Sequence, residues 1–253
     1  MKPVYIVSWL FALAISFVSC DDWLDKTPKD RLYPDVYFKT EDELRLFTNQ
    51  FYNNLVPSAV DIYSESSDLI VKSDLMLEMS GQRIIPDEGN GWNFTALRDI
   101  NFYLQYSHNC TEVNARNRYD GVARFFRAYF YFEKVKRYGD IPWYDKALDS
   151  DDPELYKARD SREFVMQKML EDLDFAIANL PKTKNAYVLT RWTALALKSR
   201  VCLFEGTFRK YHGLEDCEKY LNACVSASET FMNESGYTLY KSGSTPYRDL
   251  FAS

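Results

Sequence analysis

The chain has 253 residues, and its 19 Tyr and 17 Phe against 9 Gly favour helices rich in aromatic rings over a loop-rich β fold. The formal net charge is −6, which argues against nucleic-acid binding, because proteins that bind nucleic acids present a basic face. The sequence contains no G-x-S-x-G, H-E-x-x-H or P-loop pattern, and His108 and His212 lie in no metal-binding motif. We therefore do not expect an enzyme, and we expect neither a metal nor a cofactor.

The N-terminus has the pattern of a secretory signal peptide. Lys2 precedes an uncharged run over residues 4–18, which is too short to span a membrane, since a spanning helix needs about 20 apolar residues. The run ends in Phe-Val-Ser-Cys at residues 17–20, which resembles a bacterial lipobox, whose cysteine becomes the acylated N-terminus. We expect removal of residues 1–19 and lipidation of Cys20. The alternative is an ordinary signal peptide with an incidental cysteine.

The first helix is expected after a polar stretch that carries two prolines. This stretch predicts an extended, lipid-anchored tether over residues 20–39. Thr40 and Glu43 then form an S/T-x-x-E capping box, which is typical of a helix start. An apolar stripe follows at helical spacing: Leu44, Phe47, Phe51 and Leu55.

Beyond this helix the pattern predicts a loop and then a series of helices. Residues 56–92 mix turn formers with short apolar runs and are expected to be mostly loop. The strongest segment starts at Gly121, is apolar nearly all round, and stops at Gly139 and Pro142, as expected for a helix buried between its neighbours. The other expected helices cover residues 93–109, 161–181 (capped by Asp160 or Ser161), 190–213 (capped by Thr190) and 214–232.

A weak internal repeat indicates how these helices are arranged. Aligning Arg127 with Arg200 pairs similar residues along two helices, and each of these helices is followed by a more polar one. Stacked hairpins of this kind bury a continuous core that no single hairpin could form. The predicted fold class is mostly α, with stacked antiparallel helix hairpins like those of tetratricopeptide repeats.

Basic residues cluster between Arg124 and Arg137. Arg127 belongs to this cluster, together with Lys134 and Lys136. Glu133 and several aromatic residues interleave with the basic ones, so we expect the solvated side of one helix and not a nucleic-acid site. The aromatic residues Tyr129, Phe130 and Tyr131 are expected in the core.

Four cysteines remain beside Cys20, and none of them forms a C-x-x-C pair. Cys217 and Cys224 would lie about 10 Å apart along one helix, beyond the reach of a disulfide. Buried free thiols are therefore expected, although a bridge between Cys110 and Cys202 stays open as an alternative.

Several stretches together resemble the SusD/RagB family of outer-membrane lipoproteins. The start SCDDWLDKTPKD resembles the family's lipid cysteine, acidic residues and Leu-Asp-x-x-Pro element. The segment ARFFRAYFYFEKVKRYGDIPWY, at residues 123–144, is similar to its most recognisable element and ends in Gly-Asp-x-Pro. EDLDFAIANLP and RWTALALKSRVCLFEG resemble the next two helices. Family members are usually about twice as long, so residues 40–253 are expected to form a helical domain whose C-terminal half is missing.

The resemblance implies a binding protein on the cell exterior, lipid-anchored in the outer membrane. Such a protein captures oligosaccharide and delivers it to a SusC-type TonB-dependent transporter. Two alternatives stay open, a peptide-capturing member of the same family and a helical-repeat scaffold without a ligand.

One stretch has the composition of a sugar-binding site. Residues 81–94 contain Trp92, Asn93 and Arg83, an aromatic ring for the apolar face of a pyranose with polar groups for its hydroxyls. The stretch is expected in a loop, where binding residues concentrate. The alternative is that Trp92 only packs against the following helix.

Overall fold

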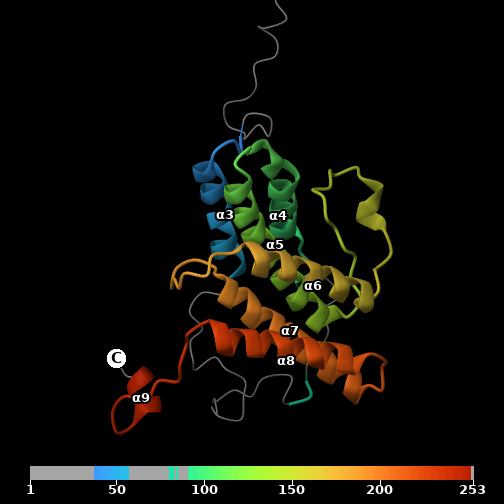
Figure 1. Cartoon of the computed structure of the whole chain (residues 1–253). Coiled ribbons are helices and arrows are strands. Elements are labelled where there is room, and N and C mark those ends of the chain that lie inside the picture. The colour runs from blue at the N-terminus through green and yellow to red at the C-terminus, as the bar shows by residue number, and fades with distance from the viewer. Residues whose placement is uncertain (1–36, 57–79, 83, 85–90, 252–253) are drawn as a thin grey trace, which may run out of the picture. The chain divides into compact units, whose positions relative to one another are not determined.

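The computed structural model describes residues 37–56, 80–82, 84 and 91–251, and these contain seven α-helices and no strand (Figure 1). The predictions for Cys20, Arg83, the signal peptide and most of the tether and of the loop at 56–92 concern residues outside this described part. Two short 3-10 helices, Ser107–Asn109 and Pro153–Tyr156, complete the secondary structure of the described part. The α-helices are α3 (Glu41–Leu55), α4 (Thr95–Tyr106), α5 (Val113–Tyr138), α6 (Arg162–Asn179), α7 (Arg191–Tyr211), α8 (Cys217–Glu234) and α9 (Pro246–Phe251).

Helices α3, α4 and α5 pack side by side around aromatic rings. The predicted capping box starts α3, because Glu43 N donates to Thr40 Oγ1 and the Glu43 carboxylate accepts from Thr40 N. Phe38, just before this cap, is fully buried and contacts the rings of Phe47 and Tyr103 at 5.0 and 5.5 Å. Edge-to-face ring pairs of this kind stabilise a core beyond the area they bury.

Helix α5 is longer than the sequence pattern predicts. It begins at Val113, eight residues before the expected start at Gly121. Gly121 lies inside α5, where a Cβ atom would meet the Leu180 side chain at 3.4 Å. Its end at Gly139, which has a φ of 71°, is confirmed, and Phe130 and Tyr131 are buried as predicted, whereas Tyr129 is partly exposed.

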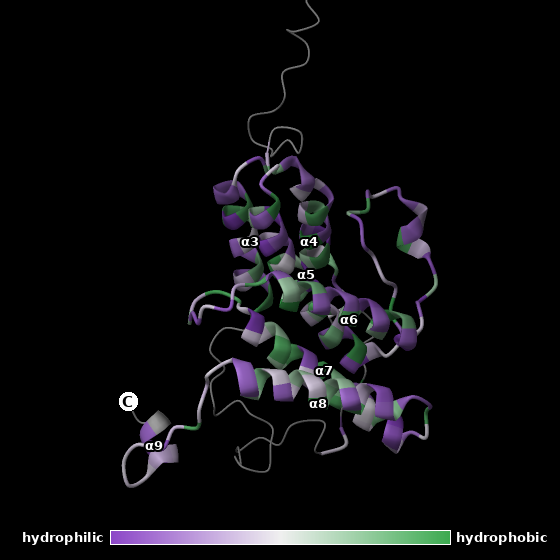
Figure 2. Ribbon diagram, in the orientation of Figure 1, coloured by the Kyte–Doolittle hydropathy of each residue, from purple (hydrophilic) through white to green (hydrophobic). Residues whose placement is uncertain are grey.

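The remaining helices stack in sequence order, α6 on α5, α7 on α6 and α8 on α7, which confirms the hairpin arrangement. Each of these helices alternates hydrophobic and hydrophilic residues along its length (Figure 2). Ser161 and Thr190 occupy the N-cap positions of α6 and α7, as predicted. Helix α8 begins at Cys217 and not at residue 214, because Asp216 takes a left-handed φ of 62° in the turn before it.

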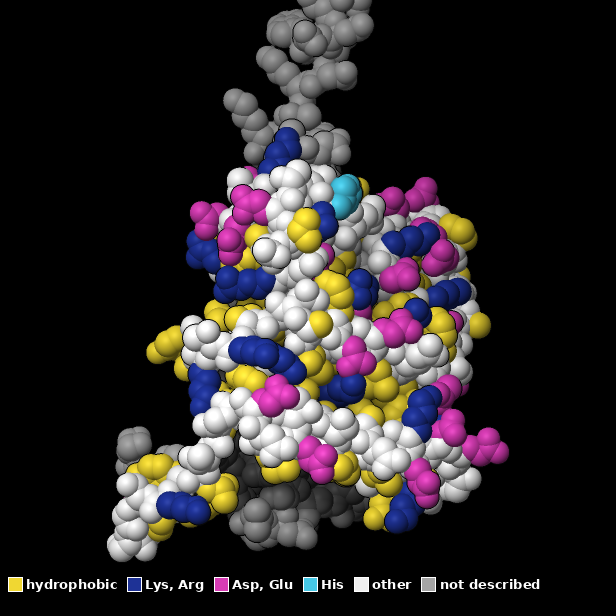
Figure 3. All heavy atoms as spheres, in the orientation of Figure 1, with side chains coloured by type: hydrophobic (Ala, Val, Ile, Leu, Met, Phe, Trp, Pro, Cys, Tyr) yellow, Lys and Arg dark blue, Asp and Glu magenta, His cyan; other side chains and the backbone are white. Residues whose placement is uncertain are grey.

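The prediction of a solvated basic cluster is wrong for one member. Arg127 is buried, and its guanidinium makes a two-pronged ion pair with the buried Asp172 of α6, from Nε to Oδ2 at 2.6 Å and from Nη2 to Oδ1 at 2.7 Å. Arg200, which aligns with Arg127 in the proposed repeat, is exposed, so the two arginines have different structural roles. Elsewhere on the face shown in Figure 3, charges of both signs are interspersed.

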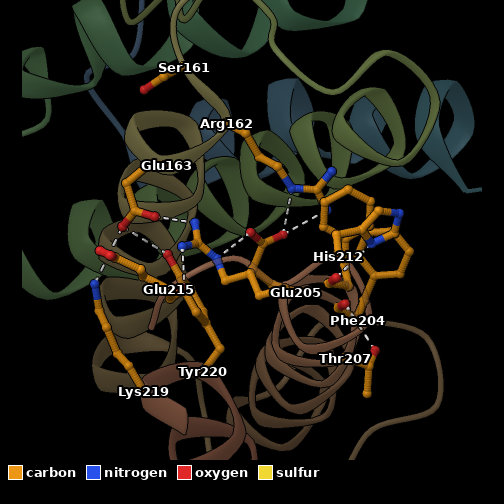
Figure 4. A network of polar contacts seen from close by, with 12 residues as sticks. Ser161, Arg162, Glu163, Phe204, Glu205, Thr207, His212, Glu215, Lys219 and Tyr220 are labelled. Carbon is orange, nitrogen blue, oxygen red and sulfur yellow. Dashed lines mark hydrogen bonds and ion pairs between the residues drawn. The ribbon is translucent and has the colours of Figure 1, made fainter. Parts of the chain in front are cut away.

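A second buried charge network joins α6, α7 and α8 (Figure 4). The Glu205 carboxylate is completely buried and accepts from Arg162 Nε and Arg209 Nε, both at 2.8 Å. Arg209 also pairs with Glu163, which accepts from Tyr220 Oη at 3.2 Å. Helices that share such a network are held in one relative position, since any shift would strand a buried charge.

All four cysteines of the described part are free, so Cys110 and Cys202 do not form a bridge. These two are buried, as expected, while Cys217 and Cys224 are partly exposed. Burial raises the pKa of Cys202 to about 12, which keeps this thiol protonated. None of the described helices is long and apolar enough to cross a membrane.

Candidate functional site

A cavity of about 530 Å³ lies between the start of α4 and the segment that joins α5 to α6. Its apolar part includes three aromatic residues, Trp92, Phe94 and Tyr144. Its polar part comprises Thr95, Arg98, Asn101, Lys146, Lys157 and Arg159. A mostly apolar pocket with a few converging polar groups is the usual form of a small-molecule site.

The wall formed by the segment 139–160 is held in place by buried polar side chains. Asn101 of α4 donates from Nδ2 to the carbonyl oxygens of Tyr144 and Lys146, at 2.8 and 3.2 Å. The Tyr131 hydroxyl of α5 accepts from Tyr144 N at 2.7 Å, and Arg98 Nε donates to Leu148 O at 3.1 Å. An antiparallel bridge between Ile141 and Asp160 closes the base of the segment. The cavity wall is therefore fixed from both neighbouring helices.

Trp92 stands at the edge of this cavity with 40% of its surface exposed. The rings of Tyr138 and Phe94 contact it edge-on at centroid distances of 4.9 and 5.3 Å. The Arg159 guanidinium lies over the indole ring at 4.9 Å. Trp92 is thus supported by its neighbours yet still accessible, which fits a binding surface better than a core position.

Asn93 lies beside Trp92 in the sequence but serves a different part of the structure. Its Oδ1 accepts from Thr95 N at 2.8 Å, which satisfies one of the free N–H groups at the start of α4. Asn93 lines a second cavity, of about 550 Å³, together with Asp99 and Tyr129, and it is not among the residues that line the first. The structure therefore does not bring Trp92 and Asn93 together in one cavity.

Several lining residues were missed by sequence reasoning: Arg98, Asn101, Tyr144, Lys146, Lys157 and Arg159. Arg98 and Asn101 are three residues apart on α4, so the sequence alone could have shown that they lie on the same face of this helix. The others follow the Gly-Asp-x-Pro stop of α5, and nothing in the sequence pattern indicates that this segment folds back onto α4.

The Tyr144 hydroxyl and the two lysines of the cavity bind neighbours within the segment 139–160. Burial, with Asp160 and Glu154 acting in the same direction, raises the pKa of the Tyr144 phenol. The protonated hydroxyl donates to Glu154 O at 3.1 Å. Lys157 pairs with Asp160 at 2.9 Å, and Lys146 pairs with Glu154 at 3.0 Å. Among the described residues, no group of three metal-ligating side chains comes together.

The described part of the chain thus combines stacked helical hairpins with a cavity lined by aromatic and cationic side chains. The family model described as "Starch-binding associating with outer membrane" matches residues 52–191. The chain belongs to this SusD-like (SusD/RagB) family.

Two relatives from Formosa agariphila show how far the likeness extends. SusD-like protein P38 is 25% identical over 226 residues, which cover 81% of this chain and 43% of the relative. SusD-like protein P2 is 27% identical over 218 residues, which cover 78% of this chain and 43% of the relative. The chain therefore spans less than half the length of these relatives.

Solved structures share the fold. A SusD homolog from Bacteroides thetaiotaomicron superposes with a TM-score of 0.63 at 18% identity, covering 81% of this chain and 43% of that one. A SusD-like protein from Bacteroides fragilis gives a TM-score of 0.61 at 22% identity, covering 85% of this chain and 42% of that one. The mostly helical fold class is thereby confirmed.

Proposed function

We propose that this protein is a glycan-binding lipoprotein on the outside of the outer membrane, which passes oligosaccharide to a SusC-type TonB-dependent transporter. The observation that supports glycan binding most directly is the exposed indole of Trp92 at the rim of a cavity of about 530 Å³. The family's description as starch-binding and associated with the outer membrane is in line with this role.

The cavity offers both kinds of contact that a sugar ring needs. The aromatic faces of Trp92 and Phe94 suit the apolar C–H face of a pyranose. Thr95 and the cationic side chains of the lining provide hydrogen bonds for ring hydroxyls. The described residues of this lining include neither Asp nor Glu, and so they offer no catalytic acid and base pair. Capture without chemistry is the activity that this arrangement supports.

Replacing Trp92 by Ala tests the site. We expect glycan affinity to fall by about 2 kcal/mol, as is typical of an aromatic hot spot, with little change in melting temperature. Glycan binding and thermal unfolding should be measured on the same samples, with Tyr211→Ala as control, since Tyr211 is 82% exposed at the far end of α7. A large fall in melting temperature would identify Trp92 as a core residue instead, because burying such a ring stabilises folding by roughly 3 to 5 kcal/mol.

The membrane part of the proposal depends on Cys20. Residues 1–19 would be the signal peptide, residues 20–39 the tether and residues 40–253 the helical domain. Two or more acyl chains anchor a protein stably, whereas a single chain is marginal. Labelled fatty acid should enter the wild-type chain and not Cys20→Ala, with Cys110→Ala as the matched cysteine control. Equal labelling of the wild type and Cys20→Ala would contradict the assignment.

A further inference from the structure

The charges of the cavity point to a class of ligand. We infer, resting on the proposed function, that the glycan captured here is anionic, an oligosaccharide that carries carboxylate or sulfate groups. The juxtaposition that carries this inference is Arg159 and Arg98 on the walls of a cavity rimmed by Trp92, with no acidic residue among the described residues of its lining.

The lining is cationic in a chain that is acidic overall. Of the lining residues that the structure describes, four carry a positive charge, Arg98, Lys146, Lys157 and Arg159, and none carries a negative one. The whole chain, by contrast, has 31 Lys and Arg against 37 Asp and Glu. A cavity whose walls carry one sign of charge raises the local concentration of ligands of the opposite sign.

The two lysines are already neutralised by neighbours outside the lining. Lys146 pairs with Asp152 at 3.3 Å and Glu154 at 3.0 Å, and Lys157 pairs with Asp160. These lysines hold the segment 139–160 together and contribute little net charge to the cavity.

The two arginines, in contrast, keep their charge available. Arg159 makes no ion pair within the described part of the chain. Its guanidinium carbon lies 4.9 Å from the centroid of the Trp92 ring. Arg98 Nη2 lies 3.9 Å from Asp149 Oδ1, at the limit of an ion pair between two well-exposed side chains. A guanidinium stacked on an aromatic ring still presents its N–H edge, which matches a carboxylate or sulfate with two parallel hydrogen bonds.

A sugar acid fits this arrangement better than a neutral sugar or an acidic peptide. Its ring can pack on the part of the indole that stays exposed, while its acid group meets the Arg159 guanidinium that lies over the indole. A neutral sugar would form no ion pair with Arg159, and an acidic peptide would make no use of the aromatic rim. The aromatic and cationic groups are therefore used together only by an anionic glycan.

The test is calorimetric titration of the purified full chain with four tetrasaccharides and one peptide. The anionic probes are tetragalacturonate and a sulfated chondroitin tetrasaccharide, the neutral probes are maltotetraose and xylotetraose, and the peptide is tetraglutamate. We expect an anionic glycan to bind most tightly, and its affinity to fall as NaCl rises from about 0.05 M to about 0.5 M, because salt screens exposed charges.

Arg159→Gln should weaken that binding about tenfold, and Arg159→Lys should weaken it less. Arg200→Gln, an exposed arginine of α7 outside the cavity, should change nothing.

The possible outcomes separate this inference from the proposed function. Neutral glycans that bind as tightly as anionic ones, with binding lost in Trp92→Ala, would overturn the inference and leave the proposed function standing. If no tetrasaccharide binds, the result contradicts both the inference and the proposed function. Tetraglutamate that binds as tightly as the best glycan would show that charge alone is recognised and would also overturn the inference. An unchanged melting temperature of Arg159→Gln is the check that any loss of affinity is local.

Discussion

Replacing Asp172 by Asn is expected to lower the free energy of unfolding by about 3 to 5 kcal/mol, the effect of removing one partner of a buried ion pair. Asp172 is 2% exposed and accepts two hydrogen bonds from the Arg127 guanidinium, whose Nη1 also donates to Asn101 Oδ1 at 3.3 Å. The amide of Asn retains the shape of the side chain but leaves the charge of Arg127 buried without a counter-ion. Urea unfolding followed by circular dichroism would measure the loss.

The neighbouring residue provides the control. Glu171 pairs with Lys168 at 2.9 Å on the surface, where such pairs contribute about 1 kcal/mol or less. Glu171→Gln should therefore leave stability nearly unchanged. The double variant Arg127→Met with Asp172→Leu should recover much of the loss, because replacing both charges with apolar residues removes the uncompensated charge. Equal and small losses for Asp172→Asn and Glu171→Gln would show that the Arg127 pair does not stabilise the α5–α6 contact.

Replacing Glu205 by Gln is the second large change, with an expected loss of about 3 kcal/mol. Its carboxylate is completely buried between Arg162 and Arg209, and only Arg209 has a second acidic partner, Glu163 (Figure 4). The neutral amide leaves Arg162 as the least compensated charge of the network.

Glu234→Gln is the matched control for Glu205→Gln, because Glu234 pairs with Arg191 at 3.4 Å while half-exposed. Thermal unfolding should show a large fall for Glu205→Gln and almost none for Glu234→Gln. If Glu205→Gln melts at the wild-type temperature, the network does not fix α6 and α7, and hydrophobic packing alone holds them.

Periodicity and caps predicted the existence of α3 to α8, but not every helix end and not α9. Thr40, Ser161 and Gly139 mark ends that the structure confirms. The start of α5 was missed because Gly121 is accommodated by tertiary packing against Leu180, which no local pattern reveals. The burial of Arg127 was missed for a similar reason, since its partner Asp172 lies 45 residues away and appears in sequence as one of many acidic residues.

The candidate site was predictable only in part. Trp92 stood out because tryptophan in a polar, turn-rich stretch has few structural reasons to be there. Arg159 and Tyr144 could not be predicted, because their approach to α4 depends on Asn101, which binds backbone groups 43 and 45 residues further along the chain. Asn93 is a residue type that often binds ligands, yet its Oδ1 accepts from Thr95 N at the start of α4.

The central claim, that a glycan binds at Trp92, is tested most directly by nuclear magnetic resonance of the indole N–H signals. The chain has five tryptophans, and Trp92→Phe assigns the signal of interest by its disappearance. Trp192 is 5% exposed and donates its indole N–H to Lys182 O, so its signal serves as an internal reference. Titration with the four tetrasaccharides named above should shift the Trp92 signal saturably for at least one glycan while the Trp192 signal stays in place. A glycan that binds without moving the Trp92 signal would contradict the account and place the ligand elsewhere.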